Sequence, residues 1–223
     1  MKRAVTLLSG GIDSATAAAV AKAEGWDLLA LTIDYGQRHQ RELDAARKVA
    51  TFLTALEHIV VNVNLRAWGG SALTSEIAVP QRAEIGPDIP ATYVPARNLI
   101  FLSLAVSYAE AKGALRVYFG ANSLDYSGYP DCRPEFLQAF AKAAALGTRI
   151  GVEAQPVEII APLQHLTKAE IIQRGLDLGL DYSLTWSCYQ GEEKACGKCD
   201  SCQIRLKAFK SLGLADPIAY ASE

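Results

Sequence analysis

The first 65 residues alternate between short apolar segments and segments with a helical period, and this alternation restricts the possible folds more than any other feature of the sequence. Residues 3–9, 27–35 and 57–65 are apolar, which predicts buried strands. Residues 13–25 and 41–53 lie between them and have the spacing of helices. Strands that alternate with helices in this way predict an α/β protein with a doubly wound sheet, right-handed crossovers and helices on both faces.

A long irregular segment, residues 66–95, interrupts this pattern with four prolines and no hydrophobic period. Connections of this length are usually functional, so we expect it to act as a lid over a site. Beyond it the pattern predicts strands over 114–121 and 155–163, and helices over 98–113, 133–147 and 167–179. The sequence therefore predicts a mostly parallel, five-stranded sheet in a domain of residues 1–185, with a small C-terminal segment, 186–223, packed on it.

Composition and charge limit the classes of protein to which this chain can belong. The chain has 22 lysines and arginines against 24 aspartates and glutamates, a formal charge of −2. Proteins that bind duplex DNA or tRNA usually present a basic surface, so this balance disfavours a nucleic-acid partner. No apolar stretch approaches the roughly 18 residues of a membrane span and no export signal is evident, so we expect no membrane contact and a cytoplasmic location. In that reducing compartment the five cysteines are more typical of metal ligands or catalytic groups than of disulfides.

A glycine pair directly after the first predicted strand is the strongest candidate for a binding site. The stretch SGGIDS, residues 9–14, places Gly10 and Gly11 where backbone amides can approach an anion, and the helix that follows adds its positive end. The stretch lacks the lysine of a Walker A loop and the third glycine of a dinucleotide-binding fingerprint. A simple tight turn is the alternative, but the complete string favours binding of a phosphate or pyrophosphate.

Four of the five cysteines lie within fifteen residues near the end of the sequence. Cys188, Cys196, Cys199 and Cys202 have the spacing C-x7-C-x2-C-x2-C. Four thiolates at this spacing favour one closed, tetrahedral zinc site with a structural role, because no position is left open for water. An iron–sulfur cluster is the alternative, but the ferredoxin pattern expects its fourth cysteine where this chain has leucine. We expect the metal to hold the C-terminal segment, with Trp186, against the core.

Three polar stretches lie at the ends of predicted strands or at the start of a helix, where ligands bind in doubly wound sheets. DYGQRHQRE (34–42) and YVPARNLIF (93–101) supply the candidates Asp34, Gln37, Arg38, Arg97 and Asn98. FGANSLDYSGYPDCRPEF (119–136) supplies a cluster suited to a planar heterocycle: Asn122, Asp125, Tyr126, Tyr129, Asp131 and Arg133. Taken singly, each is equally consistent with a solvated loop, a helix cap or a surface position. Cys132, in the same stretch, is more typical of a passive small residue than of a nucleophile.

The string SGGIDS resembles the pyrophosphate loop of the ATP pyrophosphatase (adenine nucleotide alpha-hydrolase) superfamily. The resemblance implies cleavage of ATP between its α- and β-phosphates, and a nucleotide-binding domain over residues 1–185. The lysine is dispensable because backbone amides and hydroxyls hold the leaving pyrophosphate. Asp13 is implied to hold Mg²⁺ as well. The ATP-binding residues implied are Leu8, Ser9, Gly10, Gly11, Ile12, Asp13, Ser14, Ala15 and Thr16 in the loop, with Asp34, Gln37, Arg38, Arg97 and Asn98 nearby.

Taken in order, SGGIDSAT, DYGQRH, PARN, GAN-x-x-DYSGYPDCRPEF and WSCY…CGKCDSC resemble the 7-cyano-7-deazaguanine synthase family of queuosine precursor biosynthesis, over essentially the whole chain. The resemblance implies an ATP-dependent ligase that converts 7-carboxy-7-deazaguanine and ammonia into the nitrile through an adenylated acid and an amide. It also implies a homodimer and, because the loop begins at residue 9 with no glutaminase domain before it, ammonia from solution or a partner. We expect Asp13, Arg97 and Lys168 to be catalytic, the two cations lying near the phosphates; a solvent-facing Lys168 at a helix start is the alternative.

Two other functions remain open. A tRNA-modifying member of the superfamily, such as a thiolase or lysidine synthetase, would use the same loop, although a sulfur route needs a reactive cysteine near the nucleotide and only Cys132 is available. A non-catalytic nucleotide- or nucleic-acid-binding module, whose metal segment contacts a partner, is the second. The sequence also leaves open which of Asp34, Asp125 and Asp131 contacts the base and which the metal.

Overall fold

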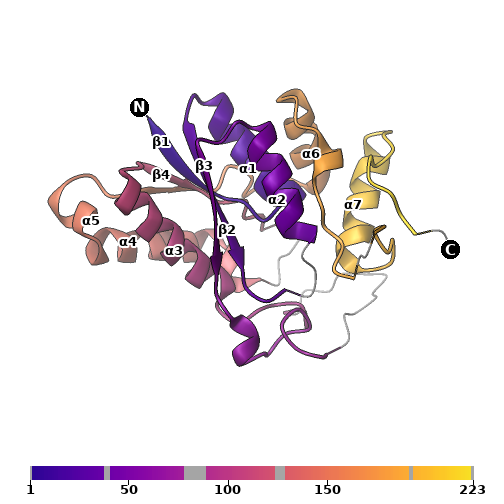
Figure 1. Cartoon of the computed structure of the whole chain (residues 1–223), viewed down its shortest axis with the longest axis horizontal. Helices are drawn as coiled ribbons and strands as arrows, with labels where there is room; N and C mark the ends of the chain where they lie inside the picture. The colour runs from indigo at the N-terminus through magenta and orange to yellow at the C-terminus, as the bar shows by residue number, and fades with distance from the viewer. Residues whose placement is uncertain (1, 38–40, 78–88, 124–128, 191–192, 222–223) are drawn as a thin grey trace.

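The fold is built on one sheet with helices packed around it (Figure 1). Within the described residues the sheet has five parallel strands in the order β3-β2-β1-β4-β5. The computed structural model describes residues 2–37, 41–77, 89–123, 129–190 and 193–221. The strands are β1 (Arg3–Leu7), β2 (Asp27–Asp34), β3 (Glu57–Asn62), β4 (Arg116–Tyr118) and β5 (Glu158–Ile160). The predicted parallel α/β sheet is confirmed.

Helices cover both faces of the sheet and form two separate hydrophobic clusters with it. Successive side chains of a strand point to opposite faces, so Val5 of β1 packs in one cluster and Ala4 in the other. The cluster of Ala4 contains residues of α1 (Ile12–Ala23), α2 (Arg41–Phe52), α6 (Lys168–Asp177) and α7 (Asp200–Ser211). The cluster of Val5 contains residues of α3 (Arg97–Lys112), α4 (Pro134–Gly147) and α5 (Arg149–Glu153). The expected doubly wound arrangement is therefore present.

The strand order reverses between β1 and β4. The chain runs outward through β1, β2 and β3, and then returns to place β4 on the other side of β1, so that Val5 pairs with both Leu29 and Val117. Ligands of doubly wound sheets bind at such a switch point, beyond the carboxyl ends of the strands. Residues 8–11 after β1 and 119–122 after β4 lie at this point, which puts the glycine loop where a ligand is expected.

The sequence pattern predicts neither α5 nor α7. α7 begins inside the cysteine motif, with Cys199 as its N-cap, and the cysteines in its first turn interrupt the hydrophobic period of the helix. α5 has only five residues and follows α4 directly, capped by the Thr148 hydroxyl, which accepts a hydrogen bond from the Gly151 amide. Short 3-10 turns also occur at η1 (Leu65–Ala67), η2 (Pro130–Cys132) and η3 (Tyr182–Leu184). β4 and β5 are shorter than predicted, because edge strand β5 pairs with β4 over three residues only.

The segment 66–95 is tied together at its ends, since the Ala72 amide donates to the Ala91 carbonyl at 2.8 Å. The middle of the predicted lid, residues 78–88, lies outside the described residues, so its role stays a prediction. None of the helices in the described ranges is long and apolar enough to cross a membrane.

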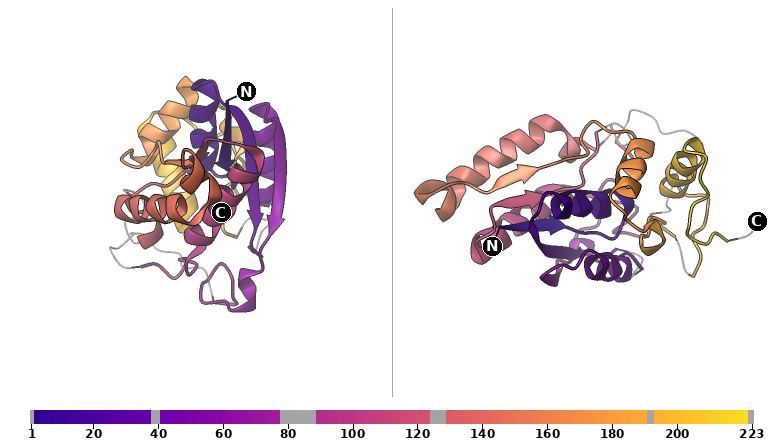
Figure 2. Two further views of the ribbon diagram at one scale, coloured as in Figure 1. Left: turned by 90° about the vertical axis from the view of Figure 1, so that its left-hand side faces the viewer. Right: turned by 90° about the horizontal axis from the view of Figure 1, so that it is seen from above.

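α7 lies beside α6, at the end of the molecule opposite α4 and α5 (Figures 1 and 2). A buried ion pair fixes it there: Arg205 Nε donates to Asp216 Oδ2 at 2.6 Å, and the two side chains are 1% and 2% exposed. Arg205 also donates to the Thr185 hydroxyl and to the Tyr182 carbonyl. One arginine therefore joins α7, the segment after it and η3.

Candidate active site

The loop between β1 and α1 has the geometry of an anion cradle. Gly10 has a φ of +85°, and a Cβ there would meet the backbone of α2, 2.6 Å from the Ala46 nitrogen and closer still to the Glu42 carbonyl oxygen. Only glycine fits this position. The hydroxyl of Ser14 accepts from the Ser9 amide at 3.1 Å, which closes the turn. No side chain in the described structure caps α1, so its first-turn amides are available to an anion.

A cavity of about 240 Å³ opens beside this loop at the carboxyl end of the sheet. Its walls come from the glycine loop, the residues after β2 and β4, the starts of α2, α3 and α6, and the C-terminal segment. Twelve of the residues expected from the sequence line it: Leu8, Ser9, Gly11, Ile12, Asp13, Ser14, Gln37, Arg97, Asn98, Asn122, Tyr129 and Lys168. The fold therefore brings together candidates that are spread over most of the chain.

Lys168 is fixed inside this cavity. Its ammonium nitrogen lies 2.6 Å and 2.7 Å from the two carboxylate oxygens of Asp13, and the residue is only 7% exposed. Thr167 and Glu170 form the predicted capping box, which starts α6 at this lysine. The alternative of a solvent-facing Lys168 is wrong.

Two of the cations that line the cavity, Arg97 and Lys168, occupy the first position of their helices. A positive charge at a helix N-terminus opposes the helix dipole and costs stability. Ala96, just before Arg97, has a φ of +54°, a left-handed conformation that is strained for alanine. These unfavourable features are typical of a site where a cation is placed for an anionic ligand.

Other expected residues lie outside the cavity lining. Gly10, in the loop itself, and Ala15, in α1, are buried, and the Thr16 hydroxyl hydrogen-bonds to the Ile12 carbonyl and the Tyr182 hydroxyl. Asp34 accepts a hydrogen bond from the Gly36 amide at the end of β2. Arg133 is the exposed N-cap of α4. Arg38, Asp125 and Tyr126 lie outside the described residues.

A second group of polar side chains lies where α3 meets η2. Asp131 Oδ2 accepts from the Asn98 amide at 3.0 Å, while Asp131 Oδ1 is buried without a hydrogen-bond partner in the described structure. Gln164 is similar: its Nε2 donates to the Cys132 carbonyl at 2.7 Å, and its buried Oε1 has no such partner. The Tyr129 and Thr92 hydroxyls hydrogen-bond to each other at 2.8 Å. Two buried acceptors thus lie beside Asn98 and Cys132, which line the cavity.

Several residues line the cavity that the sequence patterns did not place there, above all Tyr35, Glu42, Trp186 and Tyr189. Burial raises the pKa of Glu42 to about 7, although nearby Arg97 opposes the shift. Burial also raises the pKa of Tyr35 to about 12, so its hydroxyl stays protonated. Glu42 is the last residue of the polar stretch 34–42, and its place in that stretch was the only sequence feature that pointed to a role in the site.

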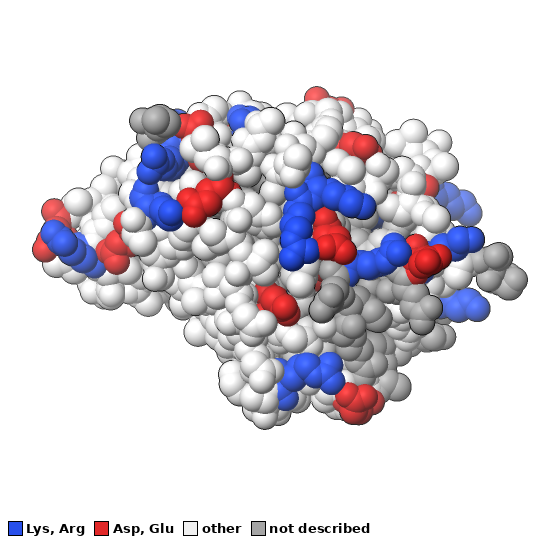
Figure 3. All heavy atoms as spheres, in the orientation of Figure 1, with Lys and Arg blue, Asp and Glu red and all other residues white. Residues whose placement is uncertain are grey.

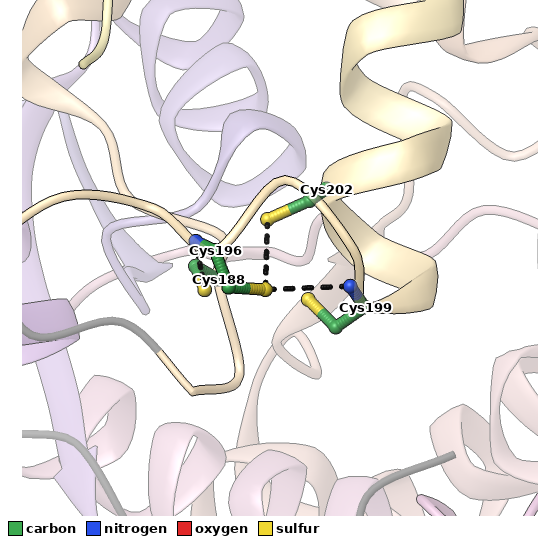
Figure 4. Close-up of side chains that lie close together, drawn as sticks. All are labelled: Cys188, Cys196, Cys199 and Cys202. Carbon is green, nitrogen blue, oxygen red and sulfur yellow. Dashed lines mark hydrogen bonds between the residues drawn. The ribbon is translucent and has the colours of Figure 1, made fainter. Parts of the chain in front are cut away.

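The four cysteines of the predicted metal site converge (Figure 4). Their sulfur atoms all lie within 4.8 Å of one another, and three of the residues are buried. Cys196 Sγ accepts from the Cys199 amide at 3.3 Å and lies 4.0 Å from Cys202 Sγ. Hydrogen bonds from the Cys199 and Cys202 thiols lower the pKa of Cys188. Four converging soft ligands, one of them readily deprotonated, fit a tetrahedral metal ion.

Trp186 connects this cluster to the glycine loop. Its backbone amide donates to the Gly10 carbonyl at 2.9 Å, and its indole nitrogen donates to the Cys188 carbonyl at 3.2 Å. Trp186 is 7% exposed and packs with Ala45 of α2 and with the cysteines. The expected position of Trp186 against the core is confirmed, and the cluster supports one wall of the cavity.

Comparison with known proteins gives strong matches over nearly the whole chain. The model of the family described as queuosine biosynthesis protein QueC matches residues 3–213. A protein of Pseudomonas savastanoi pv. phaseolicola named 7-cyano-7-deazaguanine synthase is 56% identical over 222 residues, which cover 98% of this chain and 96% of that protein. A protein of Nostoc punctiforme with the same name is 55% identical over 223 residues, which cover 98% and 100%.

Solved structures share the fold at low identity. A 4-thiouridine synthetase in an RNA complex with bound ATP matches with a TM-score of 0.50 and 22% identity, over 80% of this chain and 41% of that chain. The NMN synthetase of Francisella tularensis matches with a TM-score of 0.51 and 16% identity, over 96% and 78%. These likenesses concern the fold alone, whereas the family model matches residues 3–213 and the two relatives match nearly the full length at more than half identity. The chain therefore belongs to the family of the queuosine biosynthesis protein QueC.

Proposed function

We propose that this chain is an ATP-dependent carbon–nitrogen ligase that makes 7-cyano-7-deazaguanine from 7-carboxy-7-deazaguanine and ammonia. The observation that carries the proposal is the cavity at the switch point, into which the glycine loop opens beside two cations, Arg97 and Lys168. The names of the relatives from Pseudomonas savastanoi and Nostoc punctiforme support the product, 7-cyano-7-deazaguanine.

The proposed reaction needs two activations at one site. The carboxylate of 7-carboxy-7-deazaguanine attacks the α-phosphate of ATP, which forms an acyl-adenylate and releases pyrophosphate. Ammonia displaces AMP and gives the amide. A second ATP activates the amide oxygen in the same way, and loss of AMP leaves the nitrile. Each activation requires neutralisation of the phosphate charge and exclusion of water, which would hydrolyse the adenylate.

The residues of the cavity are suited to this task. The first-turn amides of α1 provide oriented donors for pyrophosphate oxygens, and Arg97 and Lys168 add positive charge from two other helices. Asp13 holds the Lys168 ammonium beside the loop with both of its oxygens. Asp13 is also the carboxylate in this loop that would hold Mg²⁺, which supplies further charge neutralisation when it is bound.

We place the deazaguanine ring near Tyr129, Asn122 and Asp131. A buried acceptor without a partner costs free energy, and the N–H groups of a deazaguanine edge are suitable donors for one. Asp131 Oδ1 and Gln164 Oε1 are two such acceptors in the described structure. Asp131 thus serves as a base-binding residue in this proposal rather than as a ligand of the metal ion.

Two observations favour this function over tRNA thiolation. Burial raises the pKa of Cys132 to about 12, with Asp131 adding to the effect, and a thiol that stays protonated is a poor sulfur carrier. On the face seen in Figure 3, basic and acidic side chains of the described residues are interspersed rather than gathered into a basic patch. The homodimer and the cytoplasmic location stay predictions.

Phosphorus NMR of the purified protein with ATP, Mg²⁺ and ammonium tests the proposed function. We expect AMP and pyrophosphate to appear only when 7-carboxy-7-deazaguanine is added. Formation of ADP and phosphate would contradict the adenylation mechanism. Turnover that requires tRNA would instead support the tRNA-modifying alternative.

We also propose that the four cysteines hold one structural zinc ion. Metal analysis of the purified chain should give one zinc per chain, and Cys202→Ser should lose most of it, because serine is a poor zinc ligand. The variant should also unfold at a lower temperature, because binding free energy at a structural zinc site contributes to folding. Cys132→Ser is the matched control and should keep its zinc. Iron with visible absorbance in place of zinc would favour the iron–sulfur alternative.

A further inference from the structure

Glu42 is a carboxylate in the cavity to which none of the preceding roles applies. It lies in the first turn of α2, is partly buried and lines the same cavity as the glycine loop and Arg97. Its side chain has no hydrogen-bond or ion-pair partner among the described residues, although it is close enough to Arg97 for an electrostatic interaction. A carboxylate held in a cavity without a hydrogen-bonded partner costs free energy, so a small cation that donates hydrogen bonds to it would be stabilised there.

The charged groups in this part of the cavity suit two kinds of ligand, anions and cations. Arg97 approaches from α3, Tyr35 from the end of β2 and Cys188 from the metal segment. Arg97 and Lys168 suit the anionic substrates, and Lys168 already binds Asp13. Among the described residues that line the cavity, Glu42 is therefore the carboxylate that neither binds Lys168 nor is assigned to Mg²⁺, which leaves it for a second cation. Of the substrates in the proposed reaction, ammonium is the small cation.

We propose that Glu42 is a catalytic residue of the amination step, which binds ammonium in the cavity and accepts one of its protons to release ammonia beside the adenylate. This inference rests on the proposed function and deepens it. Ammonium has no lone pair with which to attack, and at neutral pH it greatly outnumbers free ammonia. A base at the site therefore supplies the nucleophile where it is used.

Ammonium gives one proton to the Glu42 carboxylate, which becomes the neutral acid, and the freed nitrogen lone pair forms a bond to the acyl carbon. The bond between that carbon and the AMP oxygen breaks, and its electron pair leaves with AMP. The new amide nitrogen loses its extra proton to solvent, and Glu42 returns its own proton to solvent when AMP departs. No oxidant or further co-reactant is needed.

The experiment compares two nucleophiles in Glu42→Gln. Hydroxylamine is largely unprotonated at neutral pH and attacks the acyl-adenylate to give a hydroxamate without a base. We expect ammonium-dependent amide and nitrile formation to fall about 100-fold in the variant. Hydroxamate formation and the exchange of pyrophosphate with ATP in the presence of 7-carboxy-7-deazaguanine should stay near wild-type rates. Glu42→Asp, which keeps a carboxylate, should recover part of the ammonium-dependent rate.

Asp44→Asn is the matched control, because it removes an exposed carboxylate from the same helix and should leave both rates unchanged. Equal losses with ammonium and hydroxylamine would overturn the inference, since Glu42 would then act on the adenylate or the fold. Full ammonium-dependent activity in Glu42→Gln would overturn it as well. If the wild-type protein shows no exchange that depends on 7-carboxy-7-deazaguanine, the proposed function itself fails, which is a separate result.

Discussion

Replacing Arg97 with alanine is expected to lower turnover about 1,000-fold while the protein stays folded. Arg97 lines the cavity, and its guanidinium carbon lies 5.9 Å from the centre of the Tyr35 ring. The variant loses a planar cation that neutralises charge on the α-phosphate or the leaving pyrophosphate. Stability should change little, because a cation in the first turn of α3 opposes the helix dipole. Steady-state release of pyrophosphate and a thermal melt measure the two effects.

Two further variants separate the role of Arg97 from general effects. Arg97→Lys keeps a charge but loses the fork geometry, so it should recover only part of the activity. Arg47→Ala removes an exposed arginine from α2 and should leave turnover unchanged. Wild-type turnover in a folded Arg97→Ala protein would contradict the catalytic role.

Replacing Asp216 with asparagine is expected to destabilise the protein by about 3 to 5 kcal/mol, because it leaves the buried Arg205 guanidinium without its counter-charge. For a chain of this size the loss corresponds to a fall in Tm of roughly 6 to 20 °C. Asp216 also accepts from the Tyr220 hydroxyl and the Ile218 amide, so the whole segment after α7 should loosen. A melt followed by circular dichroism measures the change.

The cause of this loss can be tested separately. A double variant, Arg205→Met with Asp216→Leu, removes both charges and should recover much of the lost stability. Asp44→Asn breaks an exposed pair with Arg47, whose side chains are 64% and 55% exposed, and should leave Tm unchanged. An unchanged Tm in Asp216→Asn would show that the buried pair does not hold α7 in place.

Many elements of the fold could be predicted because their signals are local. The alternation of apolar and helical segments predicted the strands and most helices, and the capping box marked the start of α6 at Lys168. The glycine loop and the cysteine spacing are also local, since each needs residue types at fixed separations. α7 escaped prediction because its N-cap Cys199 and its first-turn residue Cys202 belong to the cysteine cluster as well as to the start of the helix.

The candidate site was only partly predictable, because its contacts join distant parts of the chain. Asp13 and Lys168 are 155 residues apart, and their ion pair depends on packing of α6 beside α1. Glu42 enters the cavity because α2 packs closely against Gly10. Neither the ion pair between Asp13 and Lys168 nor the position of Glu42 in the cavity can be inferred from spacing along the chain.

The sequence by itself determined the fold class, the glycine loop after β1 and the four-cysteine cluster, because hydrophobic period, glycine conformation and cysteine spacing are properties of residues close together in the sequence. Only the tertiary structure decided the strand order, and with it the switch point between β1 and β4 at which the loop lies. It also decided which charges are paired and which remain free for a ligand. Asp13 and Lys168 bind each other, whereas Glu42 has no such partner within the described residues. The burial of a side chain and the partners it binds depend on every element packed around it, so no pattern of neighbouring residues in the sequence predicts them.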